Sequence, residues 1–135
     1  MRKEIEKLLQ SVQKPARYAG GELNSVMKDK SKVALRYAFC FPDTYEIGMS
    51  HLGMKILYGV ANAREDTWCE RVFAPADDME ALMRANGEPL FALESGDPIK
   101  DFDMIGFTMQ YELSYTNILN MLDLAGVPLR TGDRK

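Results

Sequence analysis

The stretch Phe39–Gly53, with the sequence FCFPDTYEIGMSHLG, decides the fold of this chain. The segment Val33–Phe39, which leads into it, is apolar and carries aromatic and β-branched residues, as a buried strand does. Pro42 prevents that strand from continuing inside a sheet, and Gly48 permits a tight turn. The pattern predicts a strand that ends in a loop.

A helix is predicted directly after this loop. Leu52, Ile56 and Val60 recur every four residues with Leu57 beside them, which is typical of one buried helix face. Ser50 is a suitable N-cap for this helix. In an open α/β sheet, a loop between a strand and a helix lies at the carboxyl end of the strand, where ligands usually bind.

The rest of the chain alternates strands and helices. Further strands are predicted at Thr67–Phe73 and Met104–Thr108, and Pro89–Leu93 is either another strand or an extended edge segment. Helices are predicted at Arg2–Val12, Met79–Arg84 and Leu113–Ala125. This alternation predicts an α/β, Rossmann-like parallel sheet with flanking helices, in which Val33–Phe39 and Met104–Thr108 are adjacent central strands.

The chain divides into two parts by composition. Residues 1–31 form an N-terminal helix and a glycine-rich connector, and residues 32–135 form the α/β domain. The connector Ala16–Asn24 is either flexible or a lid packed over the domain. Val127–Leu129 reads as the start of a strand that the chain does not complete. We therefore expect a domain truncated at its C-terminus, which either self-associates through the uncovered edge or apolar face or has a poorly ordered tail after Leu129.

Composition limits the possible functions. The net charge of −3 gives no electrostatic reason to bind nucleic acid or an anionic membrane. No apolar run approaches the roughly 20 residues that cross a bilayer, and the charged N-terminus does not resemble a secretory signal, so we expect a cytoplasmic protein. The two cysteines, Cys40 and Cys69, are interpreted as small buried residues. A single histidine, His51, makes a protein-only zinc site improbable.

The candidate site combines the ends of two strands. His51 could reach a cofactor, or it could be a helix-terminus histidine bonded to backbone. Asp43, Glu46, Asp77 and Asp78 could share catalytic work, or they could be ordinary surface carboxylates. The predicted ligand-binding residues converge on one cleft: Pro42, Asp43, Tyr45, Glu46, Gly48, Met49, Ser50, His51, Thr108, Gln110, Tyr111 and Glu112.

Four segments together carry a family resemblance. They are Lys14–Asn24 (KPARYAGGELN), Phe41–Gly53 (FPDTYEIGMSHLG), Glu70–Pro75 (ERVFAP) and Phe102–Leu119 (FDMIGFTMQYELSYTNIL). In this order they resemble the N-terminal region of an uncharacterised family of radical SAM proteins with a B12-binding-like domain. The resemblance covers nearly the whole chain.

The resemblance implies a sheet of the flavodoxin or B12-binding type, placed before a radical SAM barrel of the same parent chain. The barrel's three-cysteine motif, which holds the 4Fe–4S cluster that cleaves S-adenosylmethionine, is absent from these 135 residues. Cluster and S-adenosylmethionine would therefore belong to another part of the parent protein. This chain alone would not be catalytic.

Cobalamin is the cofactor that the resemblance implies for this domain. Domains that supply a histidine ligand to cobalt carry the motif D-x-H-x-x-G, of which only His51 is matched, because Met49 and Met54 stand at the aspartate and glycine positions. Two functions follow. The domain either places cobalamin or a substrate against the barrel, or it is a degenerate module that serves as a scaffold or docks the substrate without a cofactor.

Overall fold

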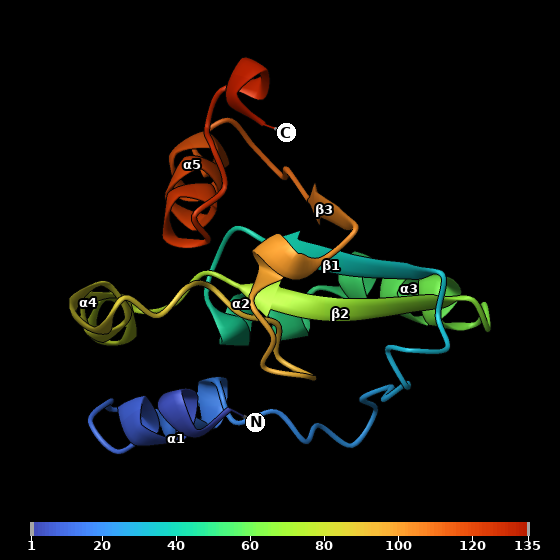
Figure 1. Ribbon diagram of the computed structural model, residues 1–135, viewed down its shortest axis with the longest axis horizontal. Coiled ribbons are helices and arrows are strands. Elements are labelled where there is room, and N and C mark those ends of the chain that lie inside the picture. The colour runs from blue at the N-terminus through green and yellow to red at the C-terminus, as the bar shows by residue number, and fades with distance from the viewer. Residues whose placement is uncertain (1, 135) are drawn as a thin grey trace.

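A sheet of three parallel strands organises the domain. The computed structural model describes residues 2–134, and its strands lie in the order β2-β1-β3 (Figure 1). The central strand β1 (Leu35–Phe41) pairs along its whole length with β2 (Thr67–Phe73) and, over four residues, with β3 (Met104–Phe107). The predicted α/β, Rossmann-like class is confirmed, as is the parallel pairing of the first and last predicted strands.

The described residues form five α-helices beside the sheet. They are α1 (Lys3–Leu9), α2 (Tyr45–Ser50), α3 (Leu52–Asn62), α4 (Asp77–Asn86) and α5 (Ser114–Leu124). Single 3-10 turns occur at Pro15–Arg17, Ile99–Asp101 and Thr131–Asp133. Within residues 2–134, no helix combines the length and the apolar character that crossing a membrane requires.

The two faces of the sheet bury separate cores. On one face, Ala38, Cys40 and Val72 pack with side chains from α1, α4 and α5, such as Ile5 and Met121. On the other face, α3 buries Met54 and Tyr58 against the aromatic rings of β1 and β2, namely Phe39, Phe41 and Phe73. This division follows from the strand period of two, because successive β1 side chains point to opposite faces.

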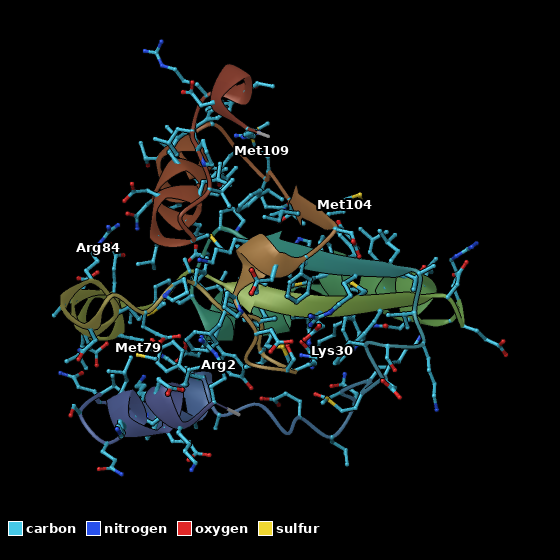
Figure 2. All side chains as sticks on the ribbon, viewed as in Figure 1. Arg2, Lys30, Met79, Arg84, Met104 and Met109 are labelled. Atoms are coloured by element: carbon cyan, nitrogen blue, oxygen red, sulfur yellow. The ribbon has the colours of Figure 1, made fainter. Side chains whose placement is uncertain are left out.

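The prediction that Met104–Thr108 is a central strand is wrong. β3 lies beside β1 as predicted, but it is an edge strand, and Met104 keeps 46% of its surface exposed. Figure 2 shows Met104 and, beyond it along the chain, Met109 on the side of the sheet away from α1. An apolar run indicates that the faces of a strand are covered, but it does not show whether both of its edges are paired.

The buried face of α3 is opposite to the one that was predicted. Leu52, Ile56 and Val60, which were expected to be buried, are 55–69% exposed, whereas Met54 and Tyr58 are buried. The loop predicted before this helix is mostly the helix α2, and His51 in extended backbone conformation separates the two helices. The N-cap of α3 is therefore His51 and not Ser50.

The two segments for which the sequence left two interpretations open both pack against the domain. Pro89–Leu93 forms no strand. It runs as an extended segment in which the Leu93 amide donates to the Arg71 carbonyl of β2 at 2.8 Å. The connector Ala16–Asn24 packs over the domain, because Tyr18 is buried and its hydroxyl accepts the Ala76 amide at 3.0 Å. Of the two interpretations of the connector, the packed one describes the structure.

The orientation of α3 generates a stability prediction. We expect Met54→Ala to lower the free energy of unfolding by about 2–5 kcal/mol, because it opens a cavity in the core. Ile56→Ala on the exposed face of the same helix should change it by less than about 0.5 kcal/mol. Urea unfolding of both variants measures the difference. An equal cost at both positions would show that the outer face of α3 is covered in solution.

Candidate functional site at the carboxyl edge of the sheet

The turn after β1 ties three elements together. The Asp43 carbonyl accepts the Ala74 amide just beyond β2 at 2.9 Å, and the Pro42 carbonyl accepts Asn117 Nδ2 of α5 at 2.9 Å. The Asp43 carboxylate accepts the amide of Thr44 at 2.7 Å. Both predicted site residues therefore lie at the carboxyl edge, where their polar groups hold the turn in place.

Gly48 allows α2 to approach the sheet closely. It is buried, and a Cβ at this position would lie 2.2 Å from Phe73 Cε1 and 3.2 Å from Phe41 Cδ1. The prediction that glycine serves a tight turn gave the wrong reason, since Gly48 is helical. Its small size matters because the helix packs directly on two aromatic rings.

Tyr45 and Glu46 face the N-terminal segment. The Tyr45 hydroxyl donates to Glu22 Oε1 at 2.5 Å, and burial together with this hydrogen bond raises the pKa of Tyr45 to about 12. Glu46 pairs with Arg17 at 2.8 Å, and that hydrogen bond lowers the pKa of the Glu46 carboxyl. Sequence reasoning did not identify Arg17 and Glu22 as neighbours of the candidate site, since their role depends on how the connector folds back.

A buried ion pair lies beneath α2. Arg71 Nε donates to Glu94 Oε1 at 2.7 Å, and both side chains are at most 3% exposed. The same guanidinium lies 3.4 Å from the sulfur of Met49, another predicted site residue, and 4.5 Å from the centre of the Tyr58 ring. Met49 therefore contacts a buried charge. Ser50 is exposed, and its hydroxyl donates to the Glu46 carbonyl one turn earlier.

His51 serves as a helix cap. Its Nδ1 accepts the Met54 amide at 3.2 Å, and its ring lies 5.2 Å from that of Phe41. In a neutral imidazole whose Nδ1 is the acceptor, Nε2 carries the proton. Neither nitrogen then offers a free lone pair to a metal. Of the two interpretations of His51, the backbone-bonded one describes the structure.

The residues after β3 form the exposed part of the candidate site. The Thr108 amide donates to the Cys40 carbonyl at 3.1 Å, while the buried Thr108 hydroxyl has no hydrogen-bond partner within residues 2–134. Gln110, Tyr111 and Glu112 are exposed and line a shallow depression together with Met109 and Tyr115.

The predicted residues thus form two groups. Within residues 42–51, Tyr45 and Glu46 contact the N-terminal segment and Gly48 packs on the core, but no residue of this group lines the depression over residues 109–112. Asn117 donates to Pro42 and Thr108 donates to Cys40, so each bond joins a predicted residue to a residue outside the predicted set. Their shared role in binding a ligand stays a prediction.

Other candidate reactive groups have structural roles. Burial raises the pKa of the Cys40 thiol, and it raises that of Cys69 to about 12, so neither thiol ionises near neutral pH. Asp77 and Asp78 begin α4, where Asp78 accepts the amides of Gln13 and Met79. Among residues 2–134, no group of three or more histidine, cysteine, aspartate or glutamate side chains could hold a metal ion.

The parallel strands define an open Rossmann-like α/β domain. Its exposed candidate-site residues, Gln110, Tyr111 and Glu112, follow the carboxyl end of β3. A family model described as "Radical SAM proteins, N-terminal" matches residues 53–135, which is more than half of the chain. The chain belongs to this family of N-terminal domains of radical SAM proteins. No curated protein and no solved structure gives a significant match.

The close packing of Gly48 generates a matched prediction. Gly48→Ala should destabilise the domain by about 1–3 kcal/mol, because the new methyl group collides with Phe73. Gly59→Ala in α3 should stabilise it by roughly 0.5–1 kcal/mol, since that position has open space and alanine favours a helix. Thermal unfolding compares the two. A melting temperature raised by both substitutions would contradict the close approach of α2 to the sheet.

Proposed function

We propose that this domain is an accessory module that docks on the radical SAM barrel of its parent protein through the surface that follows β3. The observation that carries the proposal is the exposure of five large apolar residues within eleven positions. Met109, Tyr111, Leu113, Tyr115 and Leu119 are each 47–78% exposed, and we call them the docking surface.

The composition of the docking surface supports a protein partner. Methionine and tyrosine are enriched at protein interfaces, and charged residues are depleted at their centres. Between Met109 and Leu119 the only charged residue is Glu112. Soluble monomers rarely expose such apolar patches without a binding role. The barrel is the partner that family membership supplies, since this domain belongs at the N-terminal side of a radical SAM protein.

The location of the docking surface supports a role beside the active site of the barrel. Open α/β sheets bind ligands outside the carboxyl ends of their strands, and the docking surface begins two residues after β3 ends. A barrel docked there would face the turn after β1 and the buried Thr108 hydroxyl. The 4Fe–4S cluster and S-adenosylmethionine belong to the barrel of the parent protein, so the domain would orient the substrate or close the active site.

Cobalamin is the more specific candidate ligand, and the residues present do not fit its ligation by histidine. His51 Nδ1 accepts the Met54 amide, and the ring lies 5.2 Å from that of Phe41. The scaffold or substrate-docking function therefore accounts for the structure better than a histidine-ligated cofactor domain does.

A matched pair of variants of the parent protein tests the docking. Leu113→Asp places a charge in the docking surface, and Leu23→Asp places one at a fully exposed position outside it. We expect Leu113→Asp to split a single calorimetric unfolding transition into two and to increase the radius of gyration in solution scattering. Leu23→Asp should change neither. A parent protein in which Leu113→Asp behaves like Leu23→Asp would refute docking through this surface.

A titration of the parent protein with hydroxocobalamin tests the cofactor. We expect His51→Ala to leave the visible spectrum of the mixture the same as that of the wild type, because His51 caps α3 and does not ligate cobalt. A spectral change in the wild type that is lost in His51→Ala would contradict this assignment.

A further inference from the structure

The outer edge of β3 lacks a partner strand within the described chain. β3 pairs with β1 on one side only. The Thr108 amide points to β1, where it donates to Cys40. Since successive amides of a strand point to opposite sides, those of Met104 and Gly106 also face β1, and those of Ile105 and Phe107 face outward.

A groove runs beside this edge. Its walls include the apolar side chains of Ile105 and Phe107 from β3, Leu122 from α5 and Val127 just after α5. Lys100, Asp103 and Arg134 stand among its polar residues. An extended segment laid along β3 could therefore pair with the free amides while every second side chain enters the apolar part of the groove.

The handedness of the fold indicates where the chain goes after α5. The connection from β1 to β2 runs through α3 on one face of the sheet, and the connection from β2 to β3 runs through α4 on the other face. Both follow one rule, since right-handed crossovers on opposite faces move the chain in opposite directions along the sheet. The crossover through α4 runs in the direction from β2 to β3, passing β1.

α5 lies on the same face as α4, because Met121 and Leu124 belong to the core that contains Met79 and Met83. A right-handed crossover through α5 must therefore continue in the direction from β1 to β3. It delivers the next parallel strand to the open edge of β3. Val127 and Pro128, which follow α5, already line the groove beside that edge.

We infer that the edge of β3 is a binding site for a parallel strand of the parent protein that follows α5 beyond Lys135. This strand pairs with the outward amides of Ile105 and Phe107. Its side chains are apolar at alternate positions, on the face that α5 covers. The inference depends on the family assignment and is independent of the docking surface.

Amide-resolved hydrogen exchange tests the inference without any substitution. In the parent protein, the amides of Ile105 and Phe107 should exchange at least about tenfold more slowly than in this 135-residue chain. The Gly106 amide, which faces β1 in both proteins, serves as the internal control and should change much less. Equal rates for Ile105 and Phe107 in the two proteins would overturn the inference. Protection of the two amides in the parent protein that grows with protein concentration would also overturn it, since a second copy would then fill the edge.

Matched substitutions in the parent protein test the groove separately. Val127→Glu places a charge in the groove and should return the exchange of Ile105 and Phe107 to the faster rate. Val60→Glu, on the exposed face of α3, should leave it slow. If Val127→Glu leaves both amides protected while the rest of the domain stays folded, the groove does not receive the strand.

Discussion

The buried ion pair between Arg71 and Glu94 is the interaction on which the assembly of this domain depends most. The Arg71 guanidinium donates to Glu94 in the segment after α4 and to Ser25 just after the N-terminal connector, and it contacts Met49 of α2 and Tyr58 of α3. Leaving one charge of such a pair without its partner costs about 3–5 kcal/mol. That cost is a large part of the roughly 5–15 kcal/mol that stabilises a typical domain. One side chain of β2 therefore contacts four other segments of the chain, of which only α2 and α3 are neighbours in sequence.

The arrangement of these segments separates two ends of the molecule. Around α2, every predicted site residue that could carry chemistry has an internal partner, as Tyr45 has in Glu22 and His51 has in Met54. Beyond β3, Tyr111, Leu113 and Tyr115 are exposed, and the strand edge lacks a partner within the described residues. The outer face of α3 is exposed as well, so the open strand edge is the feature that would suit a module completed by further protein, as we propose. This agrees with its membership in a family of N-terminal domains of radical SAM proteins.

Sequence reasoning predicted the parallel sheet from the alternation of strands and helices along the chain, and it predicted the strand Thr67–Phe73 from the alternating pattern of that segment. It placed the wrong face of α3 in the core, because Leu52, Ile56 and Val60 form the longest apolar stripe while Met54 and Tyr58 fill the space over the sheet. It missed the Arg71–Glu94 pair, since a charged residue inside a strand pattern is expected to face solvent. The predicted site residues lie at the carboxyl edge of the sheet, where they were expected. Their partners in the connector could not be predicted, because a glycine-rich segment carries no periodic signal of where it packs.

A structure of the parent radical SAM protein tests the central claim most directly, through the accessible surface of the residues that follow β3. The account predicts that Tyr111, Leu113 and Tyr115 are buried against the barrel, and that a fourth parallel strand lies beside β3. A structure in which these three side chains remain as exposed as they are here, with β3 still at the edge of the sheet, would contradict it.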